Sequence, residues 1–172
     1  MTSVKDYVSL PRKVSVTLVY DQKALYTSLK KWFADRRYIV IEKDYTEKIT
    51  AGGKRVFAFL WEPERRVDDY TKDVVVVEFK AEVENVQVET YEGKKKTVQS
   101  GTVLAIFSGY LIKDIESEWH MLKERPFQAV IREAYDKMVR KGKWARYKSR
   151  LEKDLTAVVA EFKAYLKVHR YD

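Results

Sequence analysis

The first regular pattern in the chain is an alternation of apolar and polar side chains from Lys13 to Tyr20. The apolar positions that share one parity are Val14, Val16, Leu18 and Tyr20. A period of two residues predicts a strand with one buried face. Asp21 follows it as a good helix N-cap. Apolar residues then recur at helical spacing and predict a helix that ends near Arg36 or Arg37. These residues are Leu25, Leu29, Trp32 and Phe33.

Strand character returns from Tyr38 to Ile49, and Gly52-Gly53 predicts a hairpin turn because tandem glycines tolerate positive φ. The next strand, 55–61, is apolar on both faces, with Phe57, Phe59 and Trp61 on one and Val56, Ala58 and Leu60 on the other. Such a strand needs cover on both sides. We expect the first helix to supply the second cover and to leave a monomer. The alternative is an exposed aromatic patch that joins two copies in a structural or assembly protein.

Two long strands follow. Val75, Val77, Phe79, Ala81 and Val83 share one parity, but Val86 and Val88 continue on the other parity. One extra residue near Glu84-Asn85 would repair the phase, so we expect a β-bulge there. The return strand runs from Thr97 to Lys113, with Gly101 and Gly109 at bend points. Strands of this kind are typical of a strongly curved antiparallel sheet.

The chain closes with helical periodicity. Pro126 suits the first position of a helix, and an apolar stripe runs from Phe127 to Val139 before Gly142 interrupts it. A second stripe then repeats at helical spacing, through Trp144, Tyr147, Leu151, Leu155, Val158, Phe162 and Leu166. We expect two helices or one kinked helix here.

The order of elements therefore predicts an α+β fold: a curved antiparallel sheet, one helix after the first strand, and a long C-terminal helix or helix pair packed on the sheet. We expect a flexible arm over residues 1–11 and one domain over 12–172, with 119–172 as a basic helical end. Over residues 12–168 this order resembles the helix-grip (START and polyketide-cyclase-like) superfamily. The resemblance implies an apolar cavity between sheet and terminal helix that holds a small lipophilic ligand.

Composition narrows the classes of function. The 172 residues include no cysteine and two histidines, which excludes disulfides, thiolate metal sites and multi-histidine sites. We expect no signal peptide, no membrane span and a cytosolic location. Four Gln and one Asn, beside abundant Lys and Glu, are typical of thermophilic proteins. No phosphate-binding glycine motif is present and the carboxylates alternate along strands, so the pattern does not favour an enzyme, and we expect no cofactor and no metal.

Charge is the most informative feature. Residues 119–172 carry 14 basic and 7 acidic side chains, whereas the remainder carries 20 and 19. Seven of the fourteen residues from Lys137 to Arg150 are basic and none is acidic, while Trp144 and Tyr147 fall on the buried stripe. We call the candidate binding residues the basic ridge, and they are Lys137, Arg140, Lys141, Lys143, Arg146, Arg150 and Lys153.

The ridge predicts a non-catalytic protein that contacts a polyanion, either nucleic acid or a ribonucleoprotein. The alternative is a helix-grip-type binder of a small apolar ligand. Its cavity would be lined by Val77, Phe79, Phe107, Val130 and Phe162. Either function is compatible with a monomer or a homodimer.

Overall fold

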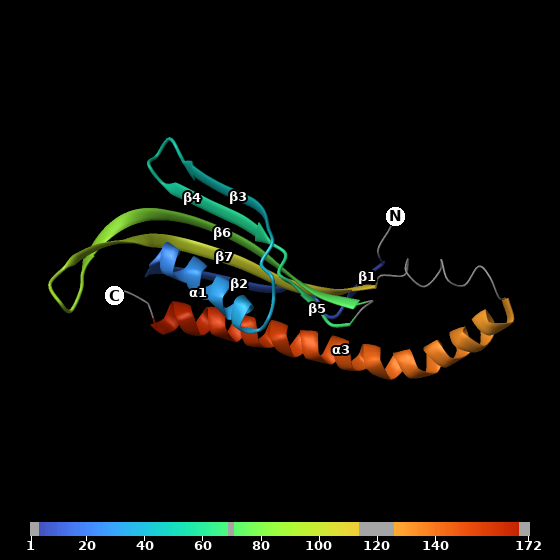
Figure 1. Ribbon diagram of the computed structural model, residues 1–172. Helices are drawn as coiled ribbons and strands as arrows, with labels where there is room; N and C mark the ends of the chain where they lie inside the picture. Colours follow the sequence, from blue (N-terminus) through green and yellow to red (C-terminus); the bar gives the residue numbers. More distant parts are fainter. Residues whose placement is uncertain (1–3, 69–70, 114–125, 169–172) are drawn as a thin grey trace.

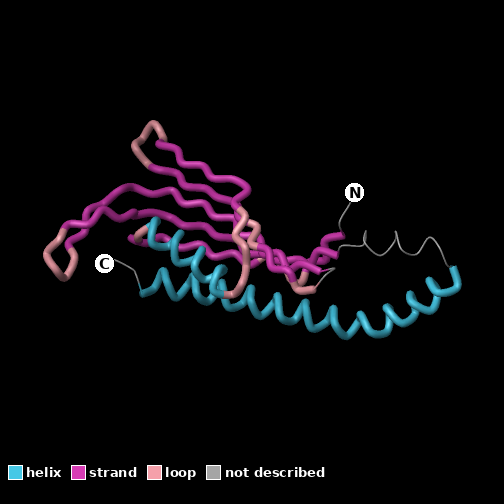
Figure 2. Tube along the Cα trace, in the orientation of Figure 1, coloured by secondary structure: helices cyan, strands magenta, loops and turns pink. Residues whose placement is uncertain are grey.

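The structure, a computed structural model, describes residues 4–68, 71–113 and 126–168. Its strands and helices, in chain order, are β1 (Val4–Tyr7), β2 (Arg12–Tyr20), α1 (Gln22–Asp35), β3 (Glu42–Ile49), β4 (Arg55–Trp61), β5 (Glu64–Arg66), β6 (Thr71–Glu89), β7 (Lys95–Lys113) and α3 (Pro126–Val168). Figure 1 shows the strands as one curved sheet with both helices beside it, and Figure 2 shows the same division into strand and helix. The α+β prediction is confirmed.

Every strand pair in the sheet is antiparallel, and the order across it is β1-β7-β6-β4-β3. β2 also pairs with β7, beside a different part of that strand from β1, and β5 pairs with β6 in the same way beside β4. The long hairpin of β6 and β7 is therefore the centre of the sheet, and shorter strands extend it on both sides.

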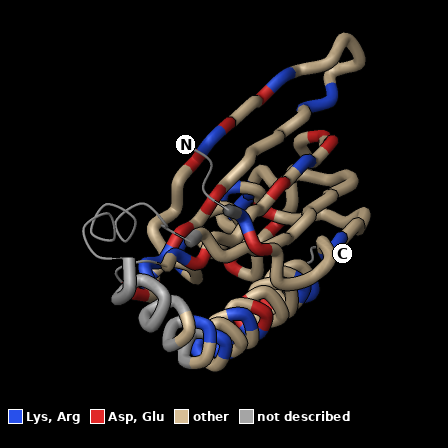
Figure 3. Tube along the Cα trace, turned by 90° about the vertical axis from the view of Figure 1, so that its right-hand side faces the viewer, with Lys and Arg blue, Asp and Glu red and all other residues tan. Residues whose placement is uncertain are grey.

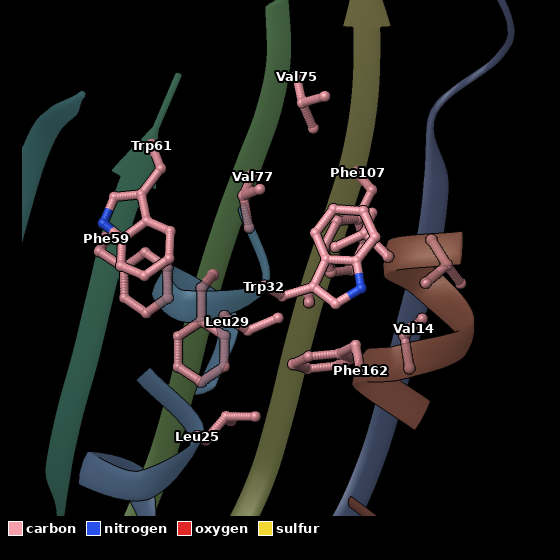
Figure 4. Close-up of a cluster of buried hydrophobic side chains, with 14 of the residues drawn as sticks. Val14, Leu25, Leu29, Trp32, Phe59, Trp61, Val75, Val77, Phe107 and Phe162 are labelled. Carbon is pink, nitrogen blue, oxygen red and sulfur yellow. The ribbon is translucent and has the colours of Figure 1, made fainter. Parts of the chain in front are cut away.

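Both helices contribute to one hydrophobic core on one face of this sheet. α3 packs over β7, with β2 and β6 on either side of that contact, and it also touches α1. Figure 4 shows Phe162 of α3 near Phe107 of the sheet, in a cluster that includes Val77 of the sheet and Leu25 and Leu29 of α1. The molecule thus has two layers, sheet and helices, with the core between them.

The face of β4 that α1 covers differs from the prediction. Phe57, Phe59 and Trp61 face the helical layer and are buried, and Tyr26 of α1 packs edge-on against Phe59 and Trp61 with ring centroids 5.5 and 4.8 Å apart. α1 therefore covers the aromatic side of β4. The predictions of an exposed aromatic patch and of a sheet sandwiched between two layers are both wrong.

The residues on the opposite side of β4 are half-buried, and no helix of the described chain packs over them. These small aliphatic residues lie directly across from charged residues of β6, in the pairs Val56–Glu82, Ala58–Lys80 and Leu60–Glu78. Long charged side chains carry apolar stems that shield neighbouring aliphatic groups while their heads stay in water. This explains how a strand apolar on both faces is accommodated at a solvated surface.

The predicted β-bulge near Glu84-Asn85 is wrong. The pairing of β6 with β7 keeps one register from Thr71–Lys113 to Glu89–Lys95. The curvature visible in Figure 1 therefore arises without an extra residue in this hairpin. At Gly101 a Cβ atom would lie 2.1 Å from the carbonyl oxygen of Glu82, so only glycine permits this close approach.

Two further expectations change near the chain ends. α3 is one helix of 43 residues that continues through Gly142, since a single glycine costs a helix only about 1 kcal/mol relative to alanine and does not end it. Figure 1 shows α3 as a curved rod that extends past the end of the sheet. Val4–Tyr7, expected within a flexible arm, instead form β1 against Tyr110–Lys113 of β7.

Candidate nucleic-acid interface

The buried side of α3 fixes which of its residues face solvent. Leu151, Leu155, Val158 and Phe162 are fully buried against the sheet. At Gly109 of β7 a Cβ atom would lie 2.9 Å from Leu155 Cδ1, so the glycine lets the helix approach the sheet closely. Because this stripe is anchored over several turns, the opposite side of α3 is held in one orientation toward solvent.

Three residues of the predicted basic ridge lie on that solvent side, and we call them the basic face: Lys143, Arg146 and Lys153. All three are exposed and form no ion pair with a described residue. Seven residues, close to two helical turns, separate Arg146 from Lys153, which places both on the same side of the helix. The face spans about 15 Å along the axis, at the rise of an α-helix. Figure 3 shows basic residues recurring along α3.

Arg150, the remaining arginine of the ridge among the described side chains, lies one turn beyond Arg146 and is also exposed, but its guanidinium is paired with a carboxylate of the sheet. Its Nη2 atom donates to Oδ2 of Asp73 on β6 at 2.9 Å. The side chain of Asp73 is 0% exposed, and that of Arg150 is 43% exposed. The guanidinium therefore neutralises a buried carboxylate, and its charge is largely committed within the fold.

Asp73 lies in a set of side chains that we call the ionic cluster: Tyr38, Arg65, Asp73, Arg150 and Asp154. Arg65 Nη2 lies 2.7 Å from Oδ2 of Asp73 and 2.7 Å from Oδ2 of Asp154 on α3. Tyr38 donates its hydroxyl to the same Asp154 oxygen at 2.8 Å, and the Arg65 guanidinium lies 4.3 Å from the centre of the Tyr38 ring. The cluster ties α3 to β5, β6 and the segment after α1.

The protonation states of this cluster follow from its surroundings. Burial raises the pKa of Tyr38 well above its usual value, so its hydroxyl stays a donor. Burial acts to lower the pKa of Arg65, but the hydrogen bond to Asp73 and the nearby negative charges outweigh it and the net pKa rises. Two carboxylates and two guanidiniums then balance in charge, which suits a structural role better than anion binding.

The sequence contained one sign of this cluster. Asp73 has the same parity along β6 as Val75 and Val77, which marks it as a charged residue on the buried face. Its partners, however, come from segments up to 77 residues away. Periodicity alone therefore indicates the buried carboxylate without identifying the arginines that pair with it.

The remaining residues of the basic ridge, Lys137, Arg140 and Lys141, lie earlier in α3. Lys137 and Lys141 are exposed, and the side chain of Arg140 lies outside the described residues. Trp144 and Tyr147 are half-buried and pack against the edge of the core, in agreement with their place on the buried stripe. Tyr147 also donates its hydroxyl to Oδ2 of Asp68 at 2.9 Å. Neither aromatic ring lies on the solvent side of α3 with the basic face.

The residues expected to line a ligand cavity lie in the core. Val77, Phe79, Phe107 and Phe162 are all buried. The ring of Phe162 contacts those of Phe107 and Phe79, with centroids 5.4 and 6.5 Å apart. The side chain of Val130 lies outside the described residues. These contacts explain how the four residues stabilise the fold, and the small-ligand cavity stays a prediction.

A second set of hydrogen-bonded side chains, Tyr26, Glu42 and Trp61, lies between α1 and the β3–β4 hairpin. The Tyr26 hydroxyl donates to Oε2 of Glu42 at 2.5 Å, and Trp61 Nε1 donates to the same oxygen at 3.0 Å. Burial and then Glu42 raise the pKa of Tyr26 to about 12, whereas the two donors lower the pKa of Glu42. Both shifts move these groups away from titration near neutral pH, so the pair is unsuited to general acid–base work.

Comparison with known proteins adds no relative: no protein-family model matches the chain, and a search of curated proteins finds no match. Within the part of the chain that the structure describes, no helix has the length and apolar character needed to cross a membrane.

Proposed function

We propose that the basic face of α3 binds the phosphate backbone of nucleic acid and that the protein acts without catalysis. One observation supports this most directly: Lys143, Arg146 and Lys153 are exposed and unpaired among the described residues, on the solvent side of a helix held in place by its buried side. Cations that need not break an internal ion pair are available to displace counterions from phosphates.

The size of the face suits a polynucleotide. Duplex DNA carries one charge per roughly 1.7 Å of its axis, so a face of about 15 Å lies beside several phosphates at once. Contacts of lysine and arginine with phosphates position a protein on nucleic acid without selecting a sequence. We therefore expect weak sequence preference.

A membrane surface fits this region less well. Binding in the plane of a membrane requires an apolar helix side that enters the lipid. In α3 that side is occupied from Leu151 to Leu166, where its apolar residues are buried against the sheet. From Leu151 to Leu166, therefore, the apolar side of α3 is not free to enter lipid.

The test is titration of fluorescently labelled 20-base-pair DNA and RNA duplexes by anisotropy over a range of salt concentrations. We expect the triple variant Lys143→Glu, Arg146→Glu and Lys153→Glu to lose three phosphate contacts. The slope of log affinity against log salt should then fall in magnitude by about 3, with affinity at least about tenfold weaker near 0.1 M salt. Arg150 is left unchanged because Asp73 needs it.

The matched control carries the same change in net charge at exposed lysines on other elements, namely Lys23→Glu and Lys31→Glu on α1 and Lys80→Glu on β6. It should retain most of the wild-type affinity and salt slope. Equal weakening in both variants would show that net charge, not the basic face, produces the binding. Absence of wild-type binding at low salt would reject the proposed function altogether.

A further inference from the structure

The two long edges of the sheet are protected differently against pairing with another chain. Among the described strands, β3 pairs with β4 alone and β2 pairs with β7 alone, so each leaves one side of its backbone without a strand partner. Open strand edges are templates for a further strand, and proteins usually protect them with charges or bulges.

β3 has both kinds of protection. Its register against β4 shifts between Glu42 and Asp44. Five of its eight residues are charged, and they are Glu42, Lys43, Asp44, Glu47 and Lys48. This edge is therefore poorly suited to receive another strand.

β2 has neither. Its nine residues pair with β7 in one unbroken register, and charges occur only at Arg12 and Lys13. The stretch from Val14 to Tyr20 is uncharged and rich in β-branched residues, which favours an additional strand. Ser15 and Thr17 on its outer face are exposed, and Val16 on its inner face is only half-buried.

α3 leaves this edge open. The helix packs mainly over β7, so it lies above the face of the sheet and not beside β2. A polar contact joins α3 to the start of β2, where Nη1 of Arg12 donates to Oγ1 of Thr156 at 2.6 Å. Among the described residues, no strand pairs with the outer edge of β2 from Val14 onward.

We propose that β2 pairs antiparallel with β2 of a second copy of this chain, about a two-fold axis at Val16, and so joins two sheets into one. In this register Val14 lies opposite Leu18 of the other copy, and Ser15 lies opposite Thr17. Apolar thus meets apolar and hydroxyl meets hydroxyl, the cross-strand pairs that stabilise sheets. Lys13 lies opposite Val19, so no like charges meet. This self-complementary pattern favours a second copy over an unrelated strand.

The helices leave room for such a dimer. A two-fold axis normal to the sheet places both copies of α3 on the same face, each mainly over its own β7. Three strand spacings separate the two β7 strands, about 14 Å in total. Packed helices need only 8–10 Å between their axes, so the two helices do not collide. The dimer does not depend on nucleic-acid binding, although it would present both basic faces on one side.

The experiment is sedimentation velocity of the protein without nucleic acid, from about 1 to 300 µM, the range in which contacts of modest area dissociate. We expect the wild type to reach twice the monomer mass as concentration rises. The variant Ser15→Glu with Thr17→Glu sets four carboxylates against one another across the axis. It should stay monomeric with an unchanged circular dichroism spectrum, because both positions are exposed.

The matched control places the same two charges at the other edge, with Thr46→Glu on β3 and Thr50→Glu beside it, and it should dimerise like the wild type. Hydrogen exchange supplies a readout that needs no substitution: within Val14–Val19, the amides that point away from β7 should gain protection with concentration, whereas those of β3 should not. A wild type that stays monomeric throughout, a Ser15–Thr17 variant that still dimerises, or exchange in β2 independent of concentration would each overturn the proposal.

Discussion

Two arginines on neighbouring turns of α3 have different partners. Arg146 and Arg150 are one helical turn apart in the same basic stretch, yet Arg146 is exposed without an ion-pair partner among the described residues. Arg150 instead binds the buried carboxylate of Asp73. The difference shows that a run of positive charge in a sequence overstates the charge that a partner can use. Some of it balances acids that the fold buries.

The need for that balance comes from desolvation. A carboxylate taken out of water loses several kcal/mol of solvation, which only close counter-charges and hydrogen bonds restore. Asp73 obtains two such partners, Arg65 from β5 and Arg150 from α3. The exposed side of α3 carries no such requirement, and its cations stay fully hydrated. Three measurements, from the largest expected effect to the smallest, test this division of α3.

Removing the buried acid should have the largest effect. In Asp73→Ala the guanidinium of Arg65 loses one of its two carboxylates and that of Arg150 loses its partner. We expect the free energy of unfolding to fall by about 3–5 kcal/mol, measured by urea denaturation. The control Asp44→Ala removes an exposed carboxylate from β3 and should change stability by no more than about 0.5 kcal/mol. Equal stability of the two variants would contradict a structural role for the cluster.

Truncating each arginine separately should show that Arg150 contributes to stability and that Arg146 contributes to nucleic-acid binding. Arg150→Ala removes one of two cations at Asp73, and we expect a loss of about 1–3 kcal/mol in urea denaturation. Arg146→Ala should leave stability within about 0.5 kcal/mol and lower the magnitude of the salt slope for duplex binding by about 1. If Arg146→Ala destabilised the fold and Arg150→Ala did not, the roles proposed for the two arginines would be reversed.

The smallest effect on stability is expected at Tyr147, which packs against the edge of the core. Tyr147→Phe deletes the hydroxyl that donates to Asp68, and we expect a loss of about 1 kcal/mol at neutral pH. Burial and then the bond to Asp68 raise the pKa of Tyr147. The stability that this group contributes is therefore fully present below its unfolded-state pKa of about 10. It is lost as pH rises through the folded value.

The difference between wild type and Tyr147→Phe should accordingly be constant from pH 6 to about pH 9 and shrink above pH 10. Urea denaturation at several pH values measures it, and titrating lysines cancel because both proteins share them. A difference that grew with pH would mean that the Tyr147 hydroxyl carries no raised pKa in the folded protein.

Much of the architecture could be predicted from local patterns. The period of two in β2, the Asp21 cap, which accepts a hydrogen bond from the amide of Ala24 at 3.0 Å, and the stripe of α1 all agree with the structure. The buried stripe from Leu151 to Leu166 was also predicted. These features depend on neighbours within one or two turns or a few strand residues, which is the range over which side-chain periodicity carries information.

The errors have two causes, contacts between distant segments and the small local cost of a single glycine in a helix. Local phase at Glu84-Asn85 suggested a bulge, but a continuous ladder with β7 outweighed it. Gly142 suggested a break, but α3 continues through it. The aromatic side of β4 is covered by α1 from the same face as α3, which no property of 55–61 alone could indicate.

The sequence by itself therefore determined the elements, their apolar faces and the excess of positive charge in the last third of the chain, because each is a sum over local residues. Only the tertiary structure decided that Arg150 neutralises Asp73 while Lys143, Arg146 and Lys153 form no ion pair with a described residue. The physical reason is that a buried charge takes its partner from whichever segment folding brings within hydrogen-bond distance. For Asp73 that segment lies 77 residues further along the chain.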